Sequence, residues 1–442
     1  MDVEALLRSA ISAGADGAEA YATRVRRYEV ATKRGKIERA VASAITSIGA
    51  RASVGRRVGG MLIANLGMGP EEAGRRLVEL ARRSPEDAHW PGFPAPRGAA
   101  VRARCLDERI VGLEPEEVVE LHRLLIEKVE DAGRRHGGAT VTEATSFVGL
   151  TECEIANTNG LRVKFTCSFH STWFEVKLAN GASYSGFVDN RRFSVDEVLR
   201  EAERAVEMAA LFVGAGPAEA GTYDAVLSPE AMIGILSSAL APAASALNIL
   251  ERRSPLAGRT GQQVLADSVT IVDDPTLDLE SGTRGYDDEG LPTRRKEVFS
   301  RGTFLRPLHS YYTAARMGEE PTGNGFRASP ASSPVPSFTN LVLVPGSGDV
   351  DELARDMRRG LVVYLTIGSW MSDPFSGRVK ATVTHGLLVE GGRPARAVKG
   401  STITGNVYEW LGDGLVALGS DVRRASGVST PSALVRGVRV GG

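Results

Sequence analysis

The sequence predicts an α+β fold, in which an N-terminal α+β region with an antiparallel sheet is followed by a β-rich, barrel-like C-terminal domain. Three observations indicate this fold. Amphipathic helical patterns alternate with strand-like runs over the first half of the chain. Many of the 50 glycines fall in short turns between β-like runs, which predicts hairpins. Residues 214–221, rich in Gly, Ala and Pro, form the clearest linker, and the pattern beyond them is mainly β.

Length and linker together predict three units. A chain of 442 residues is too long for one small core. We expect an N-terminal α+β subdomain at 1–98, a central α+β subdomain at 99–213 and a C-terminal β-rich domain at 222–442. The 84–98 stretch, rich in Pro and Gly, is expected to cross the surface between the first two units.

Composition excludes several classes of protein. Lys and Arg number 53 against 54 Asp and Glu, a balance that argues against direct nucleic-acid binding. The start of the chain does not resemble a secretory signal, and no run of eighteen apolar residues predicts a membrane span. The three cysteines are odd in number and widely spaced, which argues against a disulfide framework or a four-Cys zinc site. We expect Cys105, Cys153 and Cys167 to be reduced thiols in a cytoplasmic protein.

The first unit begins with a helix over residues 2–14, whose apolar residues recur at helical spacing. Residues 18–66 alternate like an antiparallel sheet, with turns expected at glycines. A helix over 70–83 follows and opens on a proline. The glycines expected in turns are Gly35, Gly49, Gly55, Gly59 and Gly60.

The second unit repeats the same plan. An amphipathic helix over 115–135 precedes strand-like segments joined at 157–160 and 180–181, where Asn-Gly pairs favour hairpin turns. A helix over 193–212 closes the unit, with Ser194 and Glu197 placed as a capping box. The two passes predict either a related α+β arrangement made twice or one sheet built in two instalments.

The C-terminal unit opens with a helix over 229–250, entered through Ser228 and Pro229. Most of the remainder alternates or runs apolar between turns, which favours a curled antiparallel sheet or an irregular barrel. One further helix is expected over 349–360, ended by its glycine.

Motifs for common chemistries are absent from the sequence. The six histidines are scattered, and the chain has no HExxH helix, GxSxG elbow or phosphate-binding glycine loop. His309 adjoins Ser310, but neighbours in a strand point to opposite faces, so adjacency alone makes no Ser–His couple. The acidic run 287–290 lacks calcium-loop spacing, and we interpret it as a solvated turn before a hairpin.

A family resemblance begins at this acidic run. Residues 286–327 read YDDEGLPTRRKEVFSRGTFLRPLHSYYTAARMGEEPTGNGFR, and PSFTNLVLVPG and VKGSTITGN follow at 336–346 and 398–406. The N-terminal half adds AEAYATR, IERAVASAITSIGARASVGRRVGG and IANTNG. Together these motifs resemble the TldD/PmbA family, the "modulator of DNA gyrase" or U62-type metallopeptidases, over nearly the whole chain.

The resemblance implies a helix that in TldD-type members carries His-Glu-x-x-x-His, with a Cys from the C-terminal domain completing a zinc site. The matching positions here are Ser238, Ala239 and Ala243, and Pro242 interrupts the segment. The last cysteine is Cys167, so the C-terminal half has none. The chain thus resembles the PmbA (TldE) type, for which we expect no catalytic residue, no metal ligand and no cofactor of its own.

For such a chain the resemblance implies a TldD-type metallopeptidase partner that supplies the zinc, and peptide substrates enclosed between the subunits of a homo- or heterodimer. The family-motif loops offer candidate peptide-binding residues: Asp287, Glu289, Gly290, Thr322, Gly323, Gly325 and Arg327. Two other interpretations stay open. One is a regulatory protein-binding module acting on gyrase or a toxin–antitoxin system, and the other is an autonomous, metal-independent hydrolase.

Overall fold

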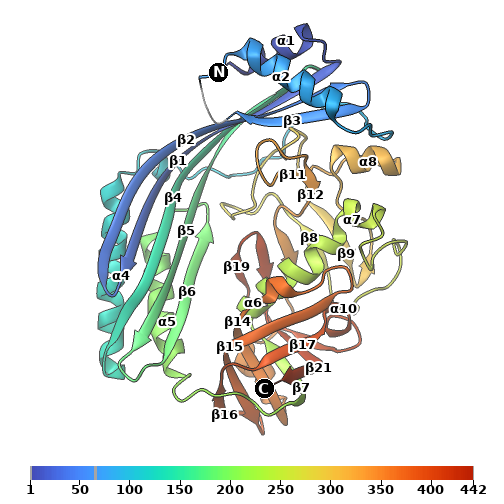
Figure 1. Cartoon of the computed structure of the whole chain (residues 1–442). Coiled ribbons are helices and arrows are strands. Elements are labelled where there is room, and N and C mark those ends of the chain that lie inside the picture. The colour runs from blue at the N-terminus through green and yellow to red at the C-terminus, as the bar shows by residue number, and fades with distance from the viewer. Residues whose placement is uncertain (1, 64–66, 442) are drawn as a thin grey trace.

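The computed structural model describes residues 2–63 and 67–441, and it has two parts (Figure 1). A long, bent antiparallel sheet backed by helices forms the first part, and a β-rich second part faces the concave side of that sheet. The predicted α+β class, the antiparallel N-terminal sheet and the barrel-like C-terminal domain are all confirmed.

The N-terminal sheet has six strands in the order β3-β2-β1-β4-β5-β6. Because β1 pairs with β4 from Glu19 opposite Asn157 to Lys33 opposite Glu143, both halves of the region share one sheet. Of the two predicted alternatives, the structure therefore has the single sheet, to which both halves of the region contribute strands. Residues 64–66, the end of the predicted run, lie outside the described residues. The strands are β1 Gly17–Lys33, β2 Lys36–Val54, β3 Arg57–Ile63, β4 Ala139–Asn157, β5 Arg162–Leu178 and β6 Ser183–Asn190.

Helices cover this sheet as its amphipathic sequences predict. On α4, Val118, Leu121, Leu125 and Val129 have no exposed surface and pack on the convex face, where α4 and α5 lie side by side (Figure 1). None of the helices in the described part of the chain has the length and apolar character needed to cross a membrane. The helices of this region are α1 Val3–Ser12, α2 Pro70–Arg83, α3 Glu108–Val111, α4 Pro115–Gly133, the 3-10 turn Arg134–His136 and α5 Val195–Ala210.

The capping box predicted at the start of α5 is only half made. Ser194 accepts a hydrogen bond from the backbone N–H of Glu197 at 3.3 Å. The carboxylate of Glu197 does not return to the Ser194 backbone, because it accepts both of its bonds from the side-chain amide of Asn190.

Two of the predicted glycine turns are correct, and the others are wrong. Gly35 and Gly55 have φ of 68° and 58° and turn the two hairpins. Gly49 lies inside β2, where an added Cβ would sit 1.9 Å from the carbonyl oxygen of Pro330. Gly59 and Gly60 lie inside β3. These glycines allow other segments to approach the sheet closely rather than reversing the chain.

The C-terminal part contains a closed five-stranded barrel in the order β14-β7-β21-β17-β15, and it closes because β15 also pairs with β14. Its strands are β7 Gly221–Leu227, β14 Arg359–Ile367, β15 Arg378–Glu390, β17 Thr402–Asn406 and β21 Ala433–Gly441. The strands β16 Arg393–Val398 and β18 Leu415–Leu418 attach to it.

A second sheet and a short ribbon complete this part. The sheet has the order β10-β9-β8-β13-β20-β19, and the ribbon pairs β11 with β12. Their bounds are β8 Ile271–Asp273, β9 Lys296–Ser300, β10 Thr303–Phe304, β11 Gly325–Phe326, β12 Val335–Pro336, β13 Leu341–Leu343, β19 Arg423–Ala425 and β20 Val428–Thr430. The remaining helices are α8 Tyr311–Met317, α9 Val350–Arg355, the 3-10 turn Ser369–Met371 and α10 Val407–Trp410.

Two helix predictions in this part are corrected. The segment 229–250 is not one helix: α6 Pro229–Ile235 continues as a π-helical turn, Leu236–Leu240, then a 3-10 turn, Ala241–Ala244, and finally α7 Ala246–Leu250. Pro242, which has no N–H to donate, lies in the 3-10 turn. The helix expected over 349–360 ends at Arg355. Gly360 is not its stop, because it pairs inside β14 with Asp224.

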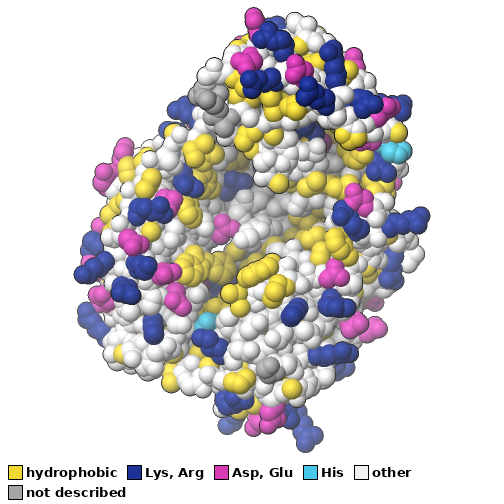
Figure 2. Space-filling model, viewed as in Figure 1, with side chains coloured by type: hydrophobic (Ala, Val, Ile, Leu, Met, Phe, Trp, Pro, Cys, Tyr) yellow, Lys and Arg dark blue, Asp and Glu magenta, His cyan; other side chains and the backbone are white. Residues whose placement is uncertain are grey.

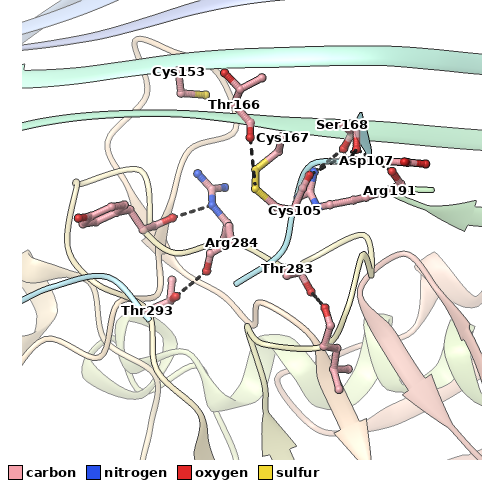
Figure 3. The surroundings of a disulfide bond; sticks show 12 residues. Cys105, Asp107, Cys153, Thr166, Cys167, Ser168, Arg191, Thr283, Arg284 and Thr293 are labelled. Atoms are coloured by element: carbon pink, nitrogen blue, oxygen red, sulfur yellow. Dashed lines mark hydrogen bonds between the residues drawn. A yellow bond between two sulfur atoms is a disulfide. The ribbon is translucent and has the colours of Figure 1, made fainter. Parts of the chain in front are cut away.

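The expectation of three reduced cysteines is wrong. Cys105 and Cys167, 62 residues apart, form a disulfide (Figure 3). The extended segment that carries Cys105 runs beside β5, where its carbonyl accepts a 2.8 Å hydrogen bond from the N–H of Ser168. This pairing brings the two Cα atoms to 4.8 Å, and sequence spacing could not have revealed it. Cys153 is a buried free thiol.

Candidate functional site

Buried charges join the two parts of the molecule. Glu19, on β1, accepts hydrogen bonds from Nε and Nη2 of Arg51, on β2, at 3.1 and 2.8 Å. It also forms an ion pair with Arg327, which comes from the C-terminal part. The side chains of all three are at most 5% exposed. The two guanidinium groups lower the pKa of Glu19 against the opposing effect of its burial.

A second buried carboxylate, Asp288, extends this cluster. It accepts hydrogen bonds from Nη2 of Arg284 at 2.6 Å, from the Tyr21 hydroxyl at 3.1 Å and from the Arg327 backbone N–H at 2.9 Å. Arg284 reaches from its loop toward β5 and the nearby disulfide (Figure 3). Its guanidinium lies 5.3 Å from the ring centre of Phe165. Every charge in this set therefore has a partner of opposite sign, as burial demands.

Between these ion pairs lie two further buried carboxyls, Asp287 and Glu289. Asp287 accepts three backbone N–H bonds at 2.9 Å, from Glu289, Leu291 and Gly325. Burial raises the pKa of Asp287 to about 7, against these three donors, which favour its ionised form. Because of the three donors, we assign the negative charge of the pair to Asp287. Burial, followed by the charge of Asp287, raises the pKa of Glu289. Glu289 is thus a neutral carboxylic acid near neutral pH, and one of its oxygens accepts the N–H of Tyr311.

The run 287–290 is therefore not the solvated turn that its acidity suggested. Asp287, Asp288 and Glu289 are 0%, 5% and 4% exposed. The neighbouring arginines and the backbone donors replace the water that such a cluster would otherwise require.

The seven family-motif residues lie in two loops that contact each other. Gly325 passes so close to Glu289 that a Cβ on it would sit 2.2 Å from Oε2. Gly323 has φ of 71° and passes against the carbonyl of Pro292. Thr322 ties the second loop to the start of α8 by accepting the His309 N–H at 2.7 Å. Gly290 has φ of 75° and packs on Leu161. These residues support the buried cluster, and their role in binding peptide stays a prediction.

A pocket of about 350 Å³ opens beside the cluster, between the two parts of the molecule. On the side of the pocket that faces the buried cluster, the lining residues are Arg51 and Glu289. Aromatic residues from both parts contribute to the remaining wall: Trp90 and Phe93 from the 84–98 connection, and Tyr311 and Tyr312 from α8. Trp90 and Phe93 meet edge to face, with ring centres 5.2 Å apart. The 84–98 connection thus lines part of this pocket as well as linking two segments.

The positions that match the family's metal helix do not fit zinc. Ser238 donates its hydroxyl hydrogen to the carbonyl of Gly234 at 2.7 Å, and Ala239 and Ala243 are buried methyl groups. Ser238 and Ala239 lie in the π-helical turn, and Ala243 lies in the 3-10 turn that follows it. These three side chains supply no imidazole or carboxylate for a zinc ion. No cluster of three or more His, Cys, Asp or Glu suited to a metal exists within 2–63 and 67–441.

Sequence reasoning missed Glu19, Tyr21, Arg51, Arg284 and the aromatic residues of the pocket. Their partners lie more than 200 residues away in several cases, beyond the reach of any local spacing rule. A signal did exist, since Glu19 and Tyr21 fall in AEAYATR and Arg51 falls in IGARASVGRRVGG. Charged residues inside otherwise alternating strands are the ones that such motifs could have singled out.

A bent antiparallel sheet that faces a barrel, with a buried ion cluster joining the two, makes up a two-part fold. Residues 220–442 match the PmbA/TldA metallopeptidase C-terminal domain, and residues 108–211 match the central domain of the same family. The chain belongs to the PmbA/TldD family.

Relatives and a solved structure agree with this assignment. A metalloprotease from Methanothermobacter thermautotrophicus is 32% identical over 55% of this chain and 52% of its own length. A metalloprotease TldD homologue from Haemophilus influenzae is 29% identical over 47% and 43%. The chain thus spans about half the length of these relatives. TldE from Thermococcus kodakarensis superposes with a TM-score of 0.89 at 23% identity over 99% of both chains, a likeness of fold.

Proposed function

We propose that this chain is the non-catalytic, PmbA/TldE-type subunit of a metallopeptidase that degrades or processes peptides. In this role it pairs with a TldD-type subunit, which supplies zinc, and it completes the chamber that encloses the peptide. The observation that carries the proposal is the segment 229–250. At the positions that match the family's zinc ligands it presents Ser238 and Ala239 in a π-helical turn and Ala243 in the 3-10 turn that follows.

A hollow between the sheet and the C-terminal part supports the binding of a polypeptide. Figure 2 shows this hollow with hydrophobic side chains on its wall. Phe147, Phe169 and Trp173 share the sheet face opposite the helices, because Thr145 and Gly149 pair with Trp173 and Phe169. Trp173 is 41% exposed. Exposed aromatic side chains on a concave face suit an unfolded peptide better than a small polar ligand.

An open sheet edge supports pairing with a second subunit. Among the residues that the structure describes, β2 pairs only with β1 over residues 36–47, since the pairing with β3 begins at Ile48. This edge exposes Ile37, Val41 and Ile45 and has no proline. The unpaired N–H and C=O groups of such an edge are a template for pairing with another chain.

The test is a mixing experiment. The chain alone should hold no stoichiometric zinc and should not cleave an unfolded casein peptide. Addition of a TldD-type subunit from the same organism should form a complex and give chelator-sensitive cleavage, with zinc content following the added subunit. Cleavage by the chain alone that survives chelation would favour the autonomous hydrolase instead. Failure to form any complex would favour the regulatory module.

A further inference from the structure

We propose that the pocket between the 84–98 connection and α8 is a subsite for one large aromatic side chain of an uncharged peptide segment. The inference rests on the proposed function, since it names part of the peptide that this chain would bind. A volume of about 350 Å³ exceeds that of a single side chain of any kind and leaves room for the adjoining backbone.

The walls of the pocket are preformed for an aromatic ring. The guanidinium of Arg51 lies 5.5 Å from the ring centre of Phe93 and 6.0 Å from that of Trp90. These contacts, together with the edge-to-face packing of the two rings, fix the wall before any ligand arrives. On the opposite side α8 is anchored by the bond from Tyr311 N–H to Glu289. A ring entering between rigid aromatic walls loses little free energy to reorganisation.

The polar groups of the pocket favour a neutral ligand. Arg51 is already paired with Glu19, to which it donates two hydrogen bonds. Glu289 is neutral, and Asp87 adds a negative charge to the lining. A ligand carboxylate would thus face Asp87 without a free cation to pair with. Arg51 Nη1, which has no hydrogen-bond partner within the described residues, can donate instead to a peptide carbonyl.

Other surface features give weaker support for a binding site. The hydrophobic side chains of Ile367, Trp370, Met371 and Phe375 are exposed near the barrel, but nothing in the structure shows what covers them. The open edge of β2 belongs to the pairing already proposed.

The test measures binding of Ac-Gly-Ser-X-Ser-Gly-NH2 peptides to the full chain without any partner, with X as Trp, Phe, Leu, Ala or Glu. We expect Trp and Phe peptides to bind at least tenfold more tightly than Ala and Glu peptides. N-acetylphenylalaninamide, as a free aromatic probe, should bind more weakly than the Phe peptide. Equal affinity for all five peptides, or tighter binding of the free probe, would overturn the subsite.

Blocking variants locate the binding. Leu247→Trp, from the α7 wall, should reduce the affinity for the Phe peptide to that of the Ala peptide. Val335→Trp, on an exposed wall residue, makes the same test should the first variant fold poorly. Val416→Trp, at an exposed position on β18, is the matched control and should bind as the parent chain does. Folded blocking variants with parental selectivity would contradict the proposal. If the parent chain shows no preference for aromatic peptides but the mixed complex still cleaves peptides, the subsite is wrong and the proposed function still holds.

Discussion

Glu19 and Arg327, 308 residues apart, form an ion pair in which both side chains are almost completely buried. One belongs to the first strand of the N-terminal sheet and the other to a loop of the C-terminal part. The pair therefore contributes to the contact between the two parts as well as to the local order of each.

Replacing Arg327 by Met should lower the free energy of unfolding by about 3–5 kcal/mol, because Glu19 would remain buried with one of its two cations missing. Chemical denaturation followed by circular dichroism measures the change. The matched control is Arg97→Met, whose ion pair with Glu320 is exposed and should contribute less than about 1 kcal/mol. Similar losses for the two variants would contradict a special role for the buried pair.

The stability contributed by the protonated carboxyl of Glu289 should fall as the pH rises from about 5 to about 8. The raised pKa of Glu289 means that the folded chain binds a proton that the unfolded chain releases above its ordinary value of 4.5. This one group therefore contributes less stability as the pH rises, by at most about 1.4 kcal/mol per pH unit. Glu289→Gln should flatten this dependence. Glu79→Gln, on the exposed face of α2, should leave it unchanged.

Gly49→Ala should destabilise the chain by about 1–3 kcal/mol, since the new methyl group would meet the Pro330 carbonyl at 1.9 Å. It should also weaken binding of the Phe peptide, because the displaced segment leads into the pocket wall at 333–335. Thermal unfolding and peptide titration measure the two effects. Gly112→Ala, where nothing lies within 4 Å of the added methyl, should change stability by less than about 0.5 kcal/mol.

Loss of the disulfide in Cys105→Ser should cost about 2–4 kcal/mol, since the bond restricts a long loop of the unfolded chain. Thiol titration in denaturant checks the pairing directly. The oxidised parent chain should show one reactive thiol, Cys153, and the reduced chain should show all three. Three thiols before reduction would disprove the bond.

The double variant Ser238→His, Ala243→His should still bind no zinc after dialysis and metal analysis. A hydrolytic site needs about three protein ligands, and the variant provides two. Ala243 is also fully buried, so an imidazole there would have to displace core atoms. A tightly held zinc in the double variant would show that a third ligand lies within reach.

Periodicity predicted the elements whose partners are close in sequence. The burial of Leu121 and Leu125 on α4 and the hairpin at 157–160 follow from local pattern alone. The buried state of Asp288 does not, because it depends on Arg284, Arg327 and Tyr21 meeting in space. The break in the 229–250 helix was only half visible: Pro242 indicated an interruption, but the preceding π-helical turn has no comparable residue signal.

The order of strands around the barrel sets an order of events during synthesis. β21 lies between β7 and β17. β7 is the first barrel strand to be synthesised and β21 is the last, so β7 has no partner on one side until β21 has been made. By then residues 17–190, which contain every strand of the bent sheet, have already emerged from the ribosome. The nascent chain thus carries a finished sheet above an open barrel until β21 emerges. During that interval the exposed edge of β7 is the surface that a chaperone would have to shield.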